Sequence, residues 1–104
     1  MTRIALIRHY PTEWNAKARL QGQTDVPLAE SSRDTLATLR MPMPWRQARL
    51  FASPLLRARE TACFLADGRE VIQDDRLIEI SWGEWEGALA ADLLADPTSG
   101  FRPR

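Results

Sequence analysis

Short blocks of apolar residues alternate with polar ones along the chain, and their spacing predicts strands and helices in turn. The strands that this pattern predicts cover residues 4–7, 49–52 and 70–73. The helices that it predicts cover residues 14–18, 30–39, 53–66 and 88–94. The run at 4–7 is continuously apolar, which is typical of a buried strand in a parallel sheet.

The helix expected over residues 53–66 has the clearest boundaries. Ser53 is a good N-cap residue and Pro54 suits a first helical turn, while Asp67-Gly68 would end the helix. The apolar face that we expect to point inward consists of Leu55, Ala58, Ala62 and Leu65. The chain's one cysteine, Cys63, is interpreted as a small core residue of this helix.

The order of these elements predicts the fold class. Strands that alternate with helices are typical of an α/β fold with a mostly parallel sheet and flanking helices. We find no internal repeat, low-complexity stretch or linker, so the sequence predicts one domain over residues 1–104.

Composition and charge narrow the class of protein. The 104 residues are 44% hydrophobic and 27% charged, as in ordinary globular proteins. The net charge is zero, which argues against a nucleic-acid partner. No apolar run has the length of a membrane span, and the first residues do not read as a signal peptide. With a single cysteine, these features predict a cytoplasmic protein that does not act at a membrane.

The only histidine, His9, follows the first predicted strand directly and has Arg8 beside it. A lone histidine is more often a structural residue than a functional one. Its position here favours function, because open α/β sheets bind their ligands at the carboxyl ends of the strands.

The residues around His9 resemble a known signature. Residues 8–15 read Arg-His-Tyr-Pro-Thr-Glu-Trp-Asn. This segment resembles the signature Arg-His-Gly-x-Thr-x-x-Asn of the histidine phosphatases, which belong to the phosphoglycerate-mutase-like superfamily. Residues 19–28, 53–62 and 77–87 are similar to the blocks that follow in that family, in the same order. The loop over 19–28 favours the branch of small phosphatases.

The resemblance implies a role for each matching residue. His9 would attack phosphorus and become a phosphohistidine, and Glu79 would donate a proton to the leaving group, with Glu84 as the fallback. The residues that would bind the phosphate are Arg8, Asn15 and Arg57, with lesser contacts from Thr12 and Gln21. In the alternative reading, Arg57 is an exposed helix residue. The glutamates are then solvated loop charges, namely Glu79, Glu84 and Glu86.

General chemistry agrees with these roles. Neutral imidazole is a nucleophile near neutral pH, and two adjacent arginines would lower the pKa of His9. A planar guanidinium meets two phosphate oxygens at once. Apolar neighbours of Glu79 would raise the pKa of its carboxyl by desolvation; these neighbours are Leu77, Ile78, Ile80 and Trp82.

Two features depart from the family pattern. Tyr10 stands where the signature has glycine, which raises the question of a positive φ at that position. The family also uses a second histidine in a C-terminal half, whereas this chain has only His9. We therefore expect a chain that is truncated at its C-terminus, with an exposed sheet edge that favours a homodimer.

The leading hypothesis is a phosphomonoester hydrolase that acts on a phosphorylated small molecule. The alternatives are a phosphotransferase of the phosphoglycerate mutase type and a non-catalytic, phosphate-binding remnant. Because the sequence shows no cluster of metal ligands, we expect no metal and no cofactor, and inhibition by vanadate.

Overall fold

The computed structural model describes residues 2–102, and positions 1, 103 and 104 of the domain predicted over 1–104 lie outside the described residues. The α-helices are α1 (Glu13–Ala16), α2 (Glu30–Leu36), α3 (Leu56–Ala66) and α4 (Ala90–Ala95). The strands are β1 (Leu50–Ala52) and β2 (Val71–Gln73). Three short 3-10 helices cover Trp45–Gln47, Asp75–Leu77 and Gly83–Trp85.

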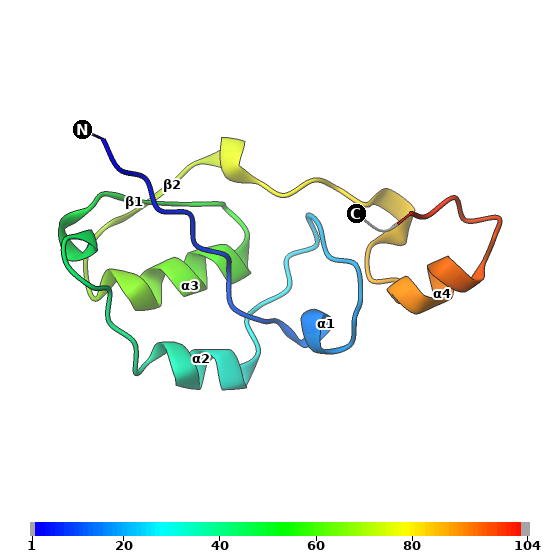
Figure 1. The fold of residues 1–104 in the computed structure, drawn as a ribbon, viewed down its shortest axis with the longest axis horizontal. Helices are drawn as coiled ribbons and strands as arrows, with labels where there is room; N and C mark the ends of the chain where they lie inside the picture. Colours follow the sequence, from blue (N-terminus) through cyan, green and yellow to red (C-terminus); the bar gives the residue numbers. More distant parts are fainter. Residues whose placement is uncertain (1, 103–104) are drawn as a thin grey trace.

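The unit β1–α3–β2 confirms the predicted α/β class. The two strands pair in parallel, with Leu50 opposite Val71 and Ala52 opposite Gln73. Helix α3 connects them and packs against both, and α2 packs against α3 (Figure 1). A salt bridge of 2.7 Å between Arg33 of α2 and Glu60 of α3 joins the two helices.

Helix α3 ends where the sequence predicts, but its buried face differs from the prediction. Asp67 adopts the left-handed conformation after Ala66 and stops the helix. Of the expected inward face, Leu55 is buried just before the helix, whereas Ala58, Ala62 and Leu65 are only half-buried. The buried residues of the helix itself are Arg57, Thr61 and Ala66. Cys63 is exposed, not a core residue, because it lies about 200° around the helix from Thr61. Side-chain polarity misled the prediction, since two of the three buried residues are polar.

The strand expected over residues 4–7 is absent from the described part of the chain. The segment pairs with no other strand, and Ile4 is 80% and Leu6 94% exposed. An apolar run becomes a buried strand only where a neighbouring strand and a covering layer meet it, and residues 2–102 provide neither. The radius of gyration is 15.8 Å, whereas a compact chain of this length has about 13 Å.

After β2 the chain runs extended along the molecule to a second packed region (Figure 1). There Leu20 donates from its backbone amide to Ala88, and Trp85 lies 5.4 Å from Phe101 in an edge-on ring contact. Trp82 is 6.3 Å from both of these rings. The tryptophans therefore serve as packing residues. No helix among residues 2–102 is long and apolar enough to cross a bilayer.

Candidate active site

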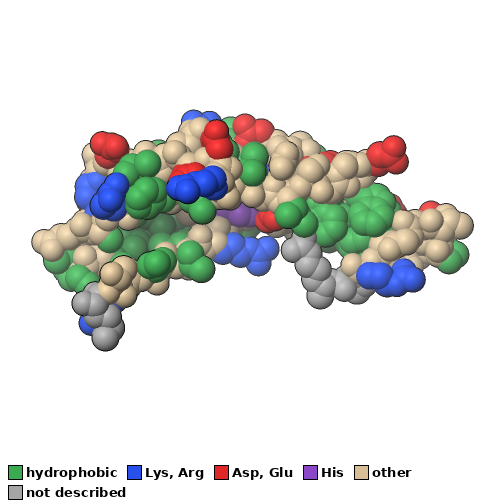
Figure 2. Space-filling view, turned by 90° about the horizontal axis from the view of Figure 1, so that it is seen from above, with side chains coloured by type: hydrophobic (Ala, Val, Ile, Leu, Met, Phe, Trp, Pro, Cys, Tyr) green, Lys and Arg blue, Asp and Glu red, His purple; other side chains and the backbone are tan. Residues whose placement is uncertain are grey.

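The imidazole of His9 is held in one tautomer. Its Nδ1 lies 2.7 Å from the carbonyl oxygen of Tyr10, which can only accept a hydrogen bond. Nδ1 therefore carries the proton, and the lone pair of Nε2 is available. Figure 2 shows the histidine in the middle of one face, with basic and acidic side chains beside it.

The surroundings of His9 favour its neutral form. Partial burial lowers the pKa of His9; the hydrogen bond to Tyr10 opposes this, the charges of Arg57 and Arg8 add to it, and the charge of Glu79 opposes it. The net pKa lies below the ordinary value of 6.5. The lowering by two arginines agrees with the sequence prediction, and the charges of Arg8, Arg57 and Glu79 all act on this one imidazole.

A buried hydroxyl connects the His9 loop to α3. Thr61 accepts a hydrogen bond of 3.1 Å from the Tyr10 amide and donates one of 2.8 Å to the Arg57 carbonyl. Tyr10 is not among the described non-glycine residues with positive φ, so the backbone accepts a side chain at this position. Sequence reasoning missed Thr61, whose only signal was its position one helical turn after Arg57.

Thr61→Val is expected to lower the free energy of unfolding by about 1–2 kcal/mol, because it leaves the Tyr10 amide without its acceptor. Urea unfolding followed by circular dichroism measures the change. Thr61→Ser keeps the hydroxyl and should retain most of the stability. Equal losses in the two variants would contradict a role for this hydroxyl.

Three of the predicted phosphate-binding residues form one hydrogen-bonded group around α1. Thr12 is fully buried, and its hydroxyl lies 2.8 Å from Oε1 of Gln21. The Thr12 amide donates to Oδ1 of Asn15 at 2.9 Å, which makes a capping box for α1. Since Oδ1 of Asn15 is used in the cap, its Nδ2 is the end that could reach a phosphate oxygen. The group holds Asn15 beside the His9 loop.

Arg57 is buried, so the reading of an exposed helix arginine was wrong. Its side chain is 2% exposed and donates to two backbone carbonyls, from Nη1 to Thr24 at 3.0 Å and from Nη2 to Gly22. Burial lowers the pKa of Arg57, and the charges of Glu79, Asp25 and Glu86 oppose that change. The two carbonyls therefore hold the guanidinium in place, and its charge acts on His9.

The loop that receives Arg57 is organised by Glu86. Its carboxylate accepts hydrogen bonds from the Gly22 amide, the Thr24 amide and hydroxyl, and the Trp82 amide, at 2.6 to 3.1 Å. Partial desolvation would raise the pKa of Glu86, but these bonds outweigh it and lower the pKa to about 2. Glu86 is therefore a hydrogen-bonded residue, and the alternative reading of it as a solvated loop charge was wrong.

Gly22 is the point of closest approach in this loop. A methyl group added to it would overlap the Ile80 carbonyl oxygen and Oε2 of Glu86. Gly22→Ala is therefore expected to cost about 3 kcal/mol of unfolding free energy, measured by urea unfolding. Gly68→Ala is the control, because its added methyl meets nothing within 4 Å and only its φ of +85° opposes it. A loss at Gly22 no larger than at Gly68 would contradict the close packing.

Glu79 lies near the site, but the apolar enclosure predicted for it is absent. Glu79 is exposed, and Leu77 and Ile80 are each 52% exposed. The segment runs along the surface, so its apolar side chains point to solvent instead of around the carboxylate. Oε1 of Glu79 accepts a hydrogen bond of 2.9 Å from the Ile80 amide. Its charge acts on both His9 and Arg57, whereas no such effect of the exposed Glu84 is found among the described residues.

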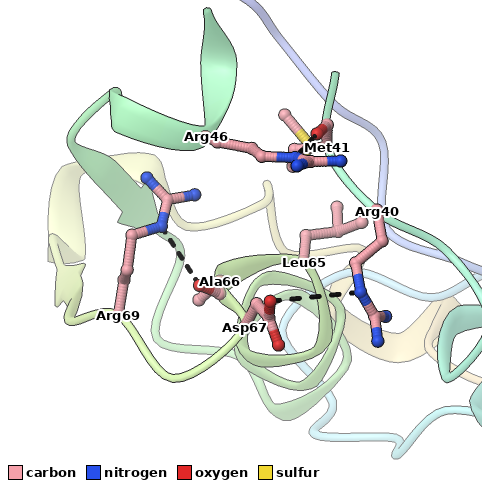
Figure 3. A pocket seen from close by; sticks show the side chains of 7 residues that line it. All are labelled: Arg40, Met41, Arg46, Leu65, Ala66, Asp67 and Arg69. Atoms are coloured by element: carbon pink, nitrogen blue, oxygen red, sulfur yellow. Dashed lines mark hydrogen bonds and ion pairs between the residues drawn. The ribbon is translucent and has the colours of Figure 1, made fainter. Parts of the chain in front are cut away.

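A second group of arginines lies at the opposite end of α3. Arg40, Arg46 and Arg69 line a cavity of about 160 Å³ there (Figure 3). Their guanidinium groups are used locally: Arg69 donates to Ala66, and Arg40 lies 4.0 Å from Asp67. The carboxyl end of a helix disfavours anions, which opposes phosphate binding in this cavity. Residues 2–102 contain no group of three or more His, Cys, Asp or Glu that could hold a metal ion.

Comparison with known families decides the affiliation. The model of the histidine phosphatase superfamily (branch 1) matches residues 4–99. The chain belongs to this superfamily. Histidine phosphatases of known structure share its fold: 88% of the chain superposes on a mycobacterial glucosyl-3-phosphoglycerate phosphatase solved with VO3, with a TM-score of 0.73 and 34% identity. A phosphoserine phosphatase from Entamoeba histolytica matches over 86% of the chain, with a TM-score of 0.69 and 30% identity.

Curated histidine phosphatase relatives include enzymes of two kinds. Phosphoserine phosphatase 1 of Hydrogenobacter thermophilus is 33% identical over 98% of this chain and 50% of its own length. A probable phosphoglycerate mutase of an Enterobacter species is 35% identical over 98% of this chain and 48% of its own length. The chain therefore spans about half the length of the relatives that it matches.

Proposed function

We propose that this histidine phosphatase chain hydrolyses phosphomonoesters through a phosphohistidine formed on His9. The observation that carries the proposal is the state of the imidazole. Its neutral form is favoured by a lowered pKa, its Nδ1 proton is engaged by Tyr10, and its Nε2 is available while the charges of two arginines act on the ring. This combination suits a nucleophile that must meet a dianionic phosphate.

The proposed reaction has two steps. Nε2 of His9 attacks phosphorus as the bond to the leaving oxygen breaks, and the carboxylic acid of Glu79 gives that oxygen a proton. Water then attacks the phosphohistidine, Glu79 takes the proton, and phosphate leaves as His9 is restored. Arg8 and Arg57 balance the negative charge on the phosphoryl oxygens, which is the main requirement of phosphoryl transfer. Asn15 adds a hydrogen bond from Nδ2, with Thr12 and Gln21 supporting it.

The substrate that we propose is a phosphorylated small molecule. The relatives are named for phosphoserine, phosphoglycerate and glucosyl-3-phosphoglycerate, which are all compact phosphate esters that carry a carboxylate. The proposed steps use no metal ion. Excess chelator should therefore leave turnover unchanged, and vanadate should inhibit by imitating five-coordinate phosphorus.

The direct test is hydrolysis of an aryl phosphate by this chain, next to calorimetric binding of inorganic phosphate. Turnover with phosphate release supports the hydrolase. Phosphate binding without turnover would contradict it and favour the non-catalytic alternative, which the single histidine of this chain motivates. Turnover that needs a bisphosphorylated primer would instead indicate a mutase, as the probable mutase relatives suggest.

The acid side of the pH profile is expected to lie lower than an ordinary histidine would give. Protonated His9 cannot attack phosphorus, so kcat/KM falls as pH drops through the pKa of the free enzyme. Because the pKa of His9 is lowered, the neutral fraction persists to more acidic pH. The midpoint of the acid limb should lie below 6.5, the ordinary value. A midpoint above that value would contradict the proposed environment of His9.

A further inference from the structure

Glu86 stands outside the group of residues around His9, yet it is the most heavily hydrogen-bonded carboxylate in the described chain. Its Oε1 accepts from the Gly22 amide, the Thr24 amide and the Thr24 hydroxyl, and its Oε2 from the Trp82 amide. It has no place in the family roles given above. A carboxylate with four donors at these distances fixes the backbone that supplies them.

The same two loop residues also hold Arg57. The Gly22 and Thr24 amides face Glu86, and the Gly22 and Thr24 carbonyls accept from the Arg57 guanidinium. In each residue the backbone amide thus binds an anion, Glu86, and the backbone carbonyl binds a cation, Arg57. The loop is a rigid spacer between Glu86 and Arg57.

The loop also holds the main chain of α3 next to Arg57. Oδ1 of Asp25 accepts a hydrogen bond of 2.6 Å from the Leu56 amide, at the start of α3. The loop therefore holds Arg57 at both ends, through the main chain of α3 and through the guanidinium. Gly22 allows this arrangement, since any larger residue would overlap Glu86 itself.

We infer that Glu86 is a positioning residue, which holds the loop over residues 22–25 so that the loop aims the Arg57 guanidinium at the phosphate. The inference rests on the proposed function, in which Arg57 binds phosphate. An arginine side chain is long and loses much rotamer freedom when it is ordered. Because Glu86 already orders the loop, the Arg57 side chain has lost this freedom before the ligand binds. Phosphate therefore meets a preorganised guanidinium group.

A double-mutant cycle tests this path. Inorganic phosphate binding is measured by calorimetry for the wild-type chain, Glu86→Gln, Arg57→Ala and the double variant. Glu86→Gln is expected to weaken binding by roughly tenfold in the wild-type background and by less than about twofold when Arg57 is absent. Glu70→Gln removes an exposed carboxylate at the start of β2 and should change nothing. Equal weakening in both backgrounds, or no weakening in the wild-type background, overturns the inference.

A second readout needs no phosphate at all. Exchange of the Arg57 guanidinium protons with water, followed by NMR in the unliganded chain, should be at least roughly tenfold faster in Glu86→Gln than in the wild type. Unchanged exchange overturns the inference. A wild-type chain that binds no phosphate contradicts the proposed function, and the exchange rates then decide the role of Glu86 by themselves. Should Glu86→Gln not fold, Glu86→Asp replaces it in both measurements, with a smaller effect of the same kind expected.

Discussion

Replacement of His9 by alanine is expected to lower turnover of an aryl phosphate by about 10⁴-fold or more, while phosphate binding changes little. The variant removes the proposed acceptor of the phosphoryl group, an imidazole on which the charges of Arg8 and Arg57 both act. The arginines remain, so the anion still has its main partners. The expected signature is thus a loss in kcat without a comparable loss in affinity.

Two measurements separate this result from a folding defect. Circular dichroism should show the same helix content in His9→Ala, and calorimetry should show phosphate affinity within a few-fold of the wild type. The tautomer-fixing bond to Tyr10 involves a backbone carbonyl, which water can satisfy in the variant. Turnover that survives in His9→Ala would mean that another group attacks phosphorus, and the proposed mechanism would be wrong.

Arg57→Ala is expected to lower kcat/KM by about 10³-fold, because it removes the buried positive charge that we propose balances the phosphoryl oxygens. It also leaves the Gly22 and Thr24 carbonyls without their donors, so the variant should unfold at a lower urea concentration. Arg57→Lys restores the charge without the planar fork. The kcat/KM of Arg57→Lys should lie between those of the wild type and Arg57→Ala, since one ammonium cannot reproduce the guanidinium geometry.

Arg59→Ala is the matched control for this prediction. Arg59 lies two positions further along α3, is exposed, and donates from Nε to the Pro54 carbonyl at 3.0 Å. Its removal takes away the same charge from the same helix without touching the loop over 22–25. Activity of Arg57→Ala within about threefold of the Arg59→Ala value would contradict the role of Arg57, because a charge that binds the transferred group is worth far more.

The sequence predicted the proposed reactive residues, but it did not predict the contacts that hold them in place. Three of the short motifs supply the proposed reactive residues: residues 8–15 carry Arg8 and His9, 53–62 carry Arg57, and 77–87 carry Glu79. The order of elements predicted the β1–α3–β2 unit, since alternating strands and helices have few other solutions. The role of each residue remains a proposal; the structure adds that the charges of Arg8, Arg57 and Glu79 all act on the imidazole of His9.

The supporting contacts were not predictable because they use backbone groups. Glu86 binds amides of residues 22 and 24, which lie more than sixty positions away in the sequence. Thr61 binds the Tyr10 amide across a similar distance. No side-chain pattern encodes such partners. The buried face of α3 was predicted wrongly for a related reason. Arginine and threonine are expected at the surface unless their buried hydrogen-bond partners are known.

The prediction of a strand over residues 4–7 was wrong for another physical reason. Ile4 and Leu6 have the apolar character that a central strand needs, but strand formation depends on a hydrogen-bonding neighbour. Local composition predicts that a segment prefers the strand conformation. It does not predict whether a neighbouring strand is present. Within residues 2–102 the run stays unpaired and exposed.

The most direct test of the account is to find where the phosphoryl group goes. The chain is incubated with an aryl phosphate, quenched in alkaline denaturant, which preserves phosphohistidine, and mapped by tandem mass spectrometry and phosphorus NMR. The account predicts one acid-labile phosphoryl group, on His9 and on its Nε2, because Nδ1 carries the proton bonded to Tyr10. Turnover with no phosphohistidine, or a phosphoryl group on Nδ1 or on another residue, would contradict it.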